Sequence, residues 1–300
     1  MRGRSIVGGF LLWLVVSYPL LVRGGEARCV NFLYATGEGE KAAGLYLPAG
    51  YNGKDSYPLV VYLHGSGGAG DNGGDALGRW LNSMPIIKEA LKKPELYECL
   101  ILVPRCPRGK LWAPVPASAK QSAWRARRHG VEGKTPDNAE ALGKAIRAVC
   151  KAYSVNTQKI TITGFSMGGE GALRYAGMHG DLFAAVAPAA GTAAVVMEDV
   201  PALSKMGVWI FQGERDRVSP SDLAQDLVQA LKQAGGQVKY TEYEGVGHGF
   251  APRVYSDRKF IEWLLEQEKG DKKSSRSSEQ FFCSLGSGEG FELGVSVVVV

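Results

Sequence analysis

The chain has 300 residues, of which 45% are hydrophobic, so it can bury a full core, and α/β folds of this length often form one domain. Its formal net charge of +5 arises from 35 basic and 30 acidic residues. This small imbalance argues against a nucleic-acid-binding protein, which would carry a strongly basic face.

The N-terminus is typical of a secretory signal peptide. Two arginines precede an apolar stretch at residues 6–16, and Gly25 and Ala27 fit a small-residue cleavage site. The apolar stretch is shorter than the ~20 residues that span a bilayer. We therefore predict a signal peptide over residues 1–27 and a secreted or periplasmic protein with no stable membrane insertion after processing. An N-terminal membrane anchor is the less favoured alternative.

Six apolar, β-branched runs alternate with helical patterns. They lie at residues 59–64, 99–104, 159–164, 183–188, 208–213 and 238–243. Apolar residues at helical spacing predict helices over 138–153, 219–236 and 256–270. This alternation predicts an α/β fold, a mostly parallel, doubly wound sheet flanked by helices in a single domain.

Two segments fall outside this alternation. The Pro-rich, basic stretch 105–136 is interpreted as a long functional loop. The Ser- and Gly-rich tail at 270–300 is either a flexible extension or an extra edge strand, which leaves 28–269 for the domain. The odd number of cysteines would leave at least one thiol unpaired in an exported chain, and none has metal-ligand spacing. We interpret them as buried apolar thiols: Cys29, Cys99, Cys106, Cys150 and Cys283.

A glycine-flanked serine follows the third apolar run. The stretch "GFSMG", from Gly164 to Gly168, matches G-x-S-x-G between a predicted strand and a helical run. Glycines at these two positions permit a tight turn that exposes the hydroxyl of Ser166. The motif predicts a nucleophile, and the alternative is a small residue in a glycine-rich bend.

A serine nucleophile needs a histidine base and an acid that orients the base. Of the four histidines, His248 is favoured because it follows the last predicted strand, at the carboxyl edge where ligands bind. Asp216 follows the preceding strand and is the preferred acid, with Glu214 as the fallback. The order Ser166, Asp216, His248 is that of α/β-hydrolases.

Acyl transfer also needs hydrogen-bond donors for the oxyanion. The backbone N–H of Met167, directly after the nucleophile, supplies one. The glycine-rich segment after the first run, with Gly65 and Ser66, is expected to supply the other and to contact substrate. That segment lacks the Gly-Lys-Ser/Thr ending of a phosphate loop, so nucleotide binding is not expected.

Taken together, these motifs resemble the α/β-hydrolase superfamily over roughly residues 30–268. The stretches "YLHGSGGAGDN", "VPRCPRGKLW", "ITGFSMGGEGALRYA" and "VKYTEYEGVGH" are similar to a group of secreted bacterial esterases. That group is labelled "predicted peptidase" or phospholipase/carboxylesterase-like, and it is related to polyhydroxybutyrate depolymerases and feruloyl esterases. The "GHGF" at 247–250 instead resembles dienelactone-hydrolase-like members, which carry a cysteine nucleophile where this chain has Ser166.

Membership of the esterase group implies a serine carboxylesterase of the α/β-hydrolase fold that needs no metal or other cofactor. It also implies a triad of Ser166, Asp216 and His248, with Met167 and Ser66 as oxyanion donors.

The substrate is less sharply specified. Trp112 and Trp124, on the predicted loop, would form a wall for an aromatic or sugar-linked acyl group, or would simply pack the loop. No apolar lid of a long-chain lipase is evident, so we expect small-molecule or polysaccharide-linked esters. A serine peptidase of the same fold stays open as an alternative. A non-catalytic binding paralogue is the third hypothesis, although such paralogues usually lose a triad residue and none is missing.

Overall fold

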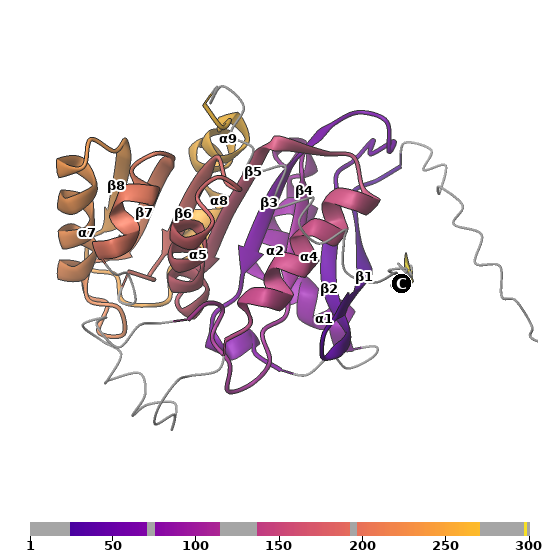
Figure 1. Ribbon diagram of the computed structural model, residues 1–300, viewed down its shortest axis with the longest axis horizontal. Helices are drawn as coiled ribbons and strands as arrows, with labels where there is room; N and C mark the ends of the chain where they lie inside the picture. The colour runs from indigo at the N-terminus through magenta and orange to yellow at the C-terminus, as the bar shows by residue number, and fades with distance from the viewer. Residues whose placement is uncertain (1–24, 71–75, 115–136, 193–196, 271–296, 299–300) are drawn as a thin grey trace, which may run out of the picture.

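The computed structural model describes residues 25–70, 76–114, 137–192, 197–270 and 297–298. In this part of the chain one mixed sheet is covered by helices on both faces (Figure 1). The strand order is β8-β7-β6-β5-β3-β4-β2-β1-β9. Strands β3 to β8 are parallel, whereas β1 and β2 are antiparallel to their neighbours.

The strands span β1 (Arg28–Thr36), β2 (Gly39–Leu47), β3 (Tyr57–Leu63), β4 (Leu100–Pro104), β5 (Val155–Phe165), β6 (Ala185–Ala189), β7 (Gly207–Gly213), β8 (Val238–Tyr243) and β9 (Val297–Val298). The α-helices span α1 (Ala76–Ser83), α2 (Pro85–Lys92), α4 (Ala139–Ala152), α5 (Met167–Met178), α6 (Val200–Leu203), α7 (Ser221–Gln233), α8 (Ala251–Ser256) and α9 (Arg258–Glu266). Three short 3-10 helices are η1 (Ser66–Gly68), η2 (Pro94–Leu96) and η3 (Met197–Asp199).

The inner strands read as continuous apolar runs because both of their faces are buried. In β3, Leu59, Val61 and Leu63 point into one hydrophobic cluster, and Val60 and Tyr62 point into the other. Side chains alternate between the two faces of a strand, so burial of both faces requires apolar residues at every position. All six predicted strands are present.

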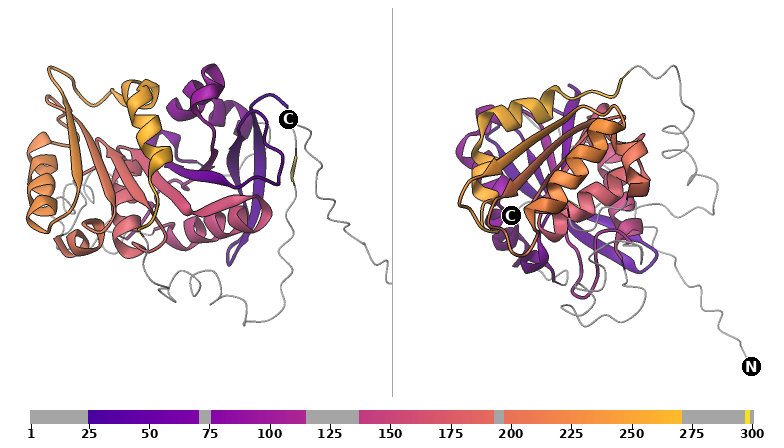
Figure 2. Two further views of the ribbon diagram at one scale, coloured as in Figure 1. Left: turned by 90° about the horizontal axis from the view of Figure 1, so that it is seen from above. Right: turned by 90° about the vertical axis from the view of Figure 1, so that its left-hand side faces the viewer.

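Two helical layers complete the core. Helices α4, α5 and α7 cover one face, and α1, α2, α8 and α9 cover the other, as the view from above in Figure 2 makes clear. The predicted helices 138–153 and 219–236 correspond to α4 and α7. The third, predicted over 256–270, begins at Arg258 because Asp257 caps α9: its side chain accepts a hydrogen bond of 2.9 Å from the Lys259 N–H.

The β1–β2 hairpin is the main element that the sequence analysis missed. It pairs from Arg28 opposite Leu47 to Thr36 opposite Gly39, and β2 then joins the sheet beside β4. Its tight turn is closed by a 2.7 Å hydrogen bond from the Thr36 hydroxyl to the Gly39 carbonyl. Phe32 from this hairpin is fully buried, so the hairpin is part of the core.

The chain ends lie largely outside the described residues. This applies to residues 1–24 of the predicted signal peptide and to residues 271–296 of the tail. Of the tail, Val297 and Val298 pair antiparallel with β1. No helix among the described residues has the length and apolar character to cross a bilayer. Four cysteines are free thiols: Cys99 and Cys106 are buried as predicted, whereas Cys29 and Cys150 are only partly buried. Cys283 lies outside the described residues.

Candidate active site

Three loops at the carboxyl edge of the sheet bring the predicted site together. Ser166 follows β5, Asp216 lies three residues after β7, and His248 lies five residues after β8. Because these strands are parallel, their carboxyl ends share one edge of the sheet, and the loops that follow them converge there.

Ser166 occupies the sharp turn between β5 and α5. Its φ of 56° and ψ of −121° lie in a region that residues other than glycine rarely adopt, at a cost of about 1–3 kcal/mol. The turn is held by a 2.8 Å bond from the Ser166 N–H to the Ala189 carbonyl. A Cβ atom on Gly168 would overlap the backbone of Leu63, so only glycine allows this close approach of helix and strand.

A continuous hydrogen-bond chain links the three side chains. His248 Nε2 lies 2.8 Å from Ser166 Oγ, and His248 Nδ1 lies 2.7 Å from Asp216 Oδ2. An ionised carboxylate only accepts hydrogen bonds, so Nδ1 carries the proton and Nε2 is left to accept the hydroxyl proton of Ser166. The histidine is therefore in the tautomer that a general base requires.

The Asp216 carboxylate is buried and well satisfied. Its Oδ1 accepts the N–H groups of Val218 at 2.8 Å and Ser219 at 2.9 Å. Burial raises the pKa of this carboxyl, but the hydrogen bonds from His248 and from these two N–H groups outweigh burial. The pKa of Asp216 thus lies below its ordinary value, and the group is anionic at neutral pH.

Aromatic packing orients the histidine ring. The Phe165 ring lies 5.0 Å from the His248 ring and meets Phe250 edge-to-face at 5.9 Å, measured between centroids. The His248 side chain keeps 26% of its surface exposed, whereas the Asp216 side chain has none. The His248 ring is thus partly exposed to solvent, while Asp216 and Phe165 hold its orientation.

The two predicted oxyanion donors flank Ser166. Met167 is the first residue of α5, where backbone N–H groups have no partner within the helix. Ser66 begins η1, directly after Gly65. A Cβ atom on Gly65 would lie 3.5 Å from the Ser166 Cβ, which places the Gly65–Ser66 segment against the serine turn.

Several alternatives are placed away from this chain of hydrogen bonds. Glu214 is exposed and accepts the Gly245 N–H at 2.5 Å. His64 is buried under the glycine-rich segment, and His179 ends α5. Trp124 lies outside the described residues, as does His129.

Trp112 packs in the core, and it also lines a small pocket beside α5. The sequence predicts that its ring forms a substrate wall or packs a long loop, and the structure places the ring in the core, 1% exposed. Its indole N–H donates to the His64 carbonyl at 2.9 Å, and the ring packs edge-on against the His64 ring at 4.9 Å. Large buried aromatics of this kind contribute mainly through packing, so the packing alternative holds.

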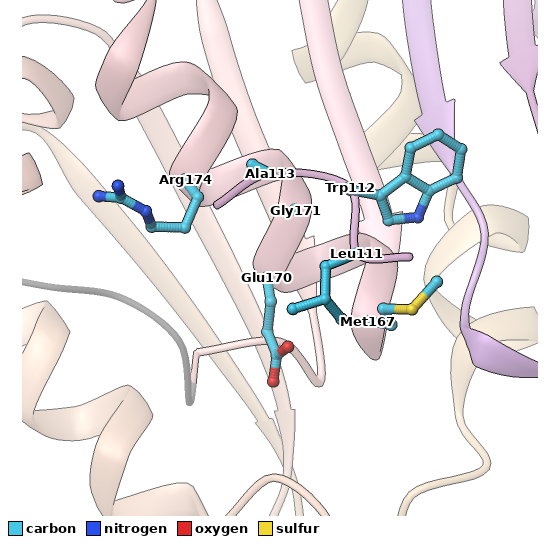
Figure 3. Close-up of a pocket in the computed structure, with 7 residues that line it drawn as sticks. All are labelled: Leu111, Trp112, Ala113, Met167, Glu170, Gly171 and Arg174. Atoms are coloured by element: carbon cyan, nitrogen blue, oxygen red, sulfur yellow. The ribbon is translucent and has the colours of Figure 1, made fainter. Parts of the chain in front are cut away.

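A small pocket lies beside the first turns of α5, and sequence reasoning identified only part of its lining (Figure 3). Within it, Arg174 forms an ion pair with Asp199 and donates from Nε to the Pro114 carbonyl at 3.1 Å. The residues that the analysis missed share the helical face that begins at Met167 or lie on the strand-like segment above it: Leu111, Ala113, Glu170, Gly171 and Arg174. The helical spacing 167, 170, 171, 174 is the signal that would have found most of them.

Among the residues that the structure describes, no three His, Cys, Asp or Glu side chains are grouped to hold a metal ion.

A mostly parallel sheet with helices on both faces, and with a serine turn, an acid and a histidine at its carboxyl edge, defines an α/β-hydrolase fold. The chain belongs to the dienelactone hydrolase family, whose profile matches residues 105–283, more than half of the chain. Both the predicted fold and the resemblance to this superfamily are confirmed. The comparison with curated proteins found no match.

Solved structures with the same fold include several esterases. A thermostable esterase is 28% identical with a TM-score of 0.62, and the match covers 80% of this chain and 63% of that one. The fluorophosphonate-binding serine hydrolase FphF of Staphylococcus aureus is 14% identical with a TM-score of 0.58, covering 81% of this chain and 100% of that one. A feruloyl esterase module of Clostridium thermocellum, complexed with sinapinate, is 17% identical with a TM-score of 0.52, covering 83% and 92%.

Proposed function

We propose that this protein is a serine hydrolase that cleaves carboxylic ester bonds through an acyl-enzyme intermediate. The observation that carries the proposal is the hydrogen-bond chain from Ser166 Oγ through His248 to Asp216, with distances of 2.8 and 2.7 Å. Those distances suit proton transfer and tautomer control without rearrangement. The strained serine turn supports the same role, because such strain concentrates at functional sites.

In the first half-reaction, Ser166 Oγ attacks the ester carbonyl carbon while its proton passes to His248 Nε2. Asp216 stabilises the imidazolium that forms, and the N–H groups of Met167 and Ser66 bind the oxyanion of the tetrahedral intermediate. Collapse of this intermediate breaks the bond to the alcohol oxygen, which takes the proton from His248. The acyl group remains on Ser166.

In the second half-reaction, water attacks the acyl carbonyl as His248 Nε2 removes its proton. The second tetrahedral intermediate is held by the same two N–H groups. Its collapse releases the carboxylic acid and returns the proton to Ser166 Oγ, so the enzyme is regenerated without a metal or a redox step.

For the substrate class, we propose small esters or acyl groups linked to polysaccharides, and a secreted or periplasmic location. The feruloyl esterase module complexed with sinapinate has this fold, which makes hydroxycinnamoyl esters a reasonable substrate set to test. The small pocket is lined by Met167, the residue that directly follows Ser166.

The decisive experiment is hydrolysis of p-nitrophenyl acetate, p-nitrophenyl butyrate and methyl ferulate by the wild type and by Ser166→Ala. The variant should lose at least about 10⁴-fold in kcat, as expected when the nucleophile is removed. His179→Gln is the control, since it replaces a histidine at the far end of α5 and should leave kcat unchanged. A fluorophosphonate probe should label the wild type only. Turnover that survives in Ser166→Ala would overturn the proposal, and cleavage of peptides but not esters would assign a peptidase.

A further inference from the structure

One of the histidines outside the Ser166–His248–Asp216 hydrogen-bond chain, His64, has a well-defined environment. His64 follows β3 and directly precedes Gly65 and Ser66, and it is 1% exposed. Its Nδ1 lies 2.7 Å from the Gly65 carbonyl oxygen, and its Nε2 lies 3.1 Å from the Cys106 backbone nitrogen. The carbonyl can only accept and the N–H can only donate, so the proton sits on Nδ1 and Nε2 is an acceptor.

The hydrogen bond at Nδ1 acts on the peptide group that carries a proposed oxyanion donor. The Gly65 carbonyl and the Ser66 N–H belong to one peptide unit, and no described peptide bond is cis. In a planar trans peptide the C=O and N–H bonds point in opposite directions. Holding the Gly65 oxygen against His64 therefore turns the Ser66 N–H away from His64.

The same carbonyl is held a second time, by the Gly68 N–H at 2.9 Å. With two donors on one oxygen, rotation of the Gly65–Ser66 peptide would break two hydrogen bonds and leave the donor of the buried His64 ring without its acceptor, which is costly. The peptide lies against the nucleophile turn, since a Cβ atom on Gly65 would be 3.5 Å from the Ser166 Cβ.

Two tryptophans enclose the His64 ring. Trp80 meets it edge-on at 5.5 Å and donates its indole N–H to the Gly68 carbonyl at 2.9 Å, and Trp112 meets it edge-on at 4.9 Å. Arg105 is the charged group near the ring. Burial, with a smaller contribution from Arg105, lowers the His64 pKa to about 4 despite its bond to Gly65. The ring is thus neutral at working pH, so the acceptor at Nε2 is retained.

We propose that His64 is a positioning residue for ester hydrolysis: its Nδ1–H donates to the Gly65 carbonyl and thereby orients the Ser66 N–H toward the oxyanion. This inference rests on the proposed esterase function. His64 touches no reacting atom. Its contribution is made through the orientation of the donor, and it should appear in kcat rather than in KM because the donor acts on developing charge.

Two near-isosteric substitutions separate the two ring nitrogens. In His64→Asn, the amide nitrogen replaces Nδ1 and keeps a donor for Gly65, whereas the acceptor for Cys106 is lost. In His64→Gln, the amide reaches the Nε2 position and keeps the acceptor, whereas the donor for Gly65 is lost. His64→Gln should lose about 10- to 100-fold in kcat with KM within about threefold. The loss of kcat in His64→Asn should be at least about fivefold smaller than in His64→Gln.

The readouts distinguish positioning from a structural role. Urea unfolding of both variants reports fold stability, and ¹⁵N spectra of the wild-type ring report the proton on Nδ1. Equal kcat losses in the two variants, losses that follow unfolding free energy alone, or a proton on Nε2 would overturn the inference. A wild type with no turnover would overturn this inference and the proposed function together. An active wild type with equal variants overturns only the role of His64.

Discussion

Two acidic side chains follow β7, and their surroundings determine which of them can serve the histidine. Asp216 is buried and accepts hydrogen bonds from His248, Val218 and Ser219. Glu214, two residues earlier, is exposed and accepts the Gly245 N–H. The Asp216 carboxylate is buried, fixed by two backbone donors and bonded to the His248 ring, so it holds that ring in one orientation, whereas the Glu214 carboxylate is held by the Gly245 N–H instead.

Replacement of Asp216 by Asn should lower kcat by about 10³- to 10⁴-fold with little change in fold. The amide N–H would donate to His248 Nδ1, which moves the ring proton to Nε2 and removes the acceptor for the Ser166 hydroxyl. Ester hydrolysis measured beside Glu214→Gln checks this, because that control should stay within about twofold of the wild type. Equal losses in the two variants would contradict the assignment.

The buried His64 predicts a pH dependence of stability. Its pKa is lowered by burial to about 4 in the folded protein, against an ordinary value of 6.5. Between these pH values the unfolded chain binds a proton that the folded protein does not, so stability falls as pH drops, by on the order of 3 kcal/mol in all. Urea unfolding at pH 7 and pH 4.5 should show this loss of unfolding free energy, and the loss between the two pH values should be smaller in His64→Gln. An equal loss in that variant would exclude His64 as its cause.

The junction of β5 and α5 depends on close backbone packing. Gly168 is the second residue of α5, and any Cβ atom there would overlap the Leu63 backbone of β3. Backbone cannot yield as a flexible side chain does, so the strand, the serine turn and the helix have one compatible arrangement. The backbone geometry of Ser166 is thus a property of this packed junction.

Gly168→Ala should therefore lower the free energy of unfolding by about 2–4 kcal/mol and reduce esterase activity in parallel. Gly78→Ala provides the matched control, because Gly78 lies within α1 and a Cβ atom there meets nothing within 4 Å. Alanine favours a helix over glycine, so the control should gain about 0.5–1 kcal/mol. Thermal or urea unfolding of both variants gives the comparison, and a tolerated Gly168→Ala would be inconsistent with this packing.

The strands in the middle of the sheet were the easiest to predict from sequence. Strands β3 to β7 are largely apolar runs, which composition reveals directly, whereas β8 was predicted although it lies at the edge of the sheet and is only partly buried. In the hairpin, β2 begins with exposed residues and is buried only in its second half. Strand β1 alternates: Val30, Phe32 and Tyr34 are buried, and the residues between them are partly exposed. That period of two is the signal of a half-buried strand, and it is weaker than a continuous run.

The arrangement of strands in the whole sheet determines which residues meet at the site. Parallel strands end at one edge, so a serine, an acid and a histidine placed after β5, β7 and β8 meet there, whatever their separation in sequence. Sequence order therefore sufficed to choose Ser166, Asp216 and His248. The burial of Trp112 was not predictable in this way, because it depends on the path of residues 105–114 across α5 rather than on strand order.

The distribution of the core predicts which part of the chain folds on its own. Both hydrophobic clusters draw their described residues from between Ala27 and Leu265, and the Gly50 N–H bonds the Gly25 carbonyl at 2.9 Å. A chain cut to residues 25–270 should thus keep its free energy of unfolding within about 1 kcal/mol of the full chain, since two-residue pairing by β9 adds little.

A second truncation, which begins at residue 48, tests the converse. It removes the β1–β2 hairpin and with it fully buried residues such as Phe32 and Leu45, whose loss strips apolar cover from the sheet and from β4. Each such side chain stabilises by about 1.5–3 kcal/mol, so the loss should exceed the 5–15 kcal/mol that holds a typical domain. Urea unfolding followed by tryptophan fluorescence should give a cooperative transition for 25–270 and none for the shorter chain. A loss above about 2 kcal/mol in 25–270 would instead assign the tail a structural part in the fold.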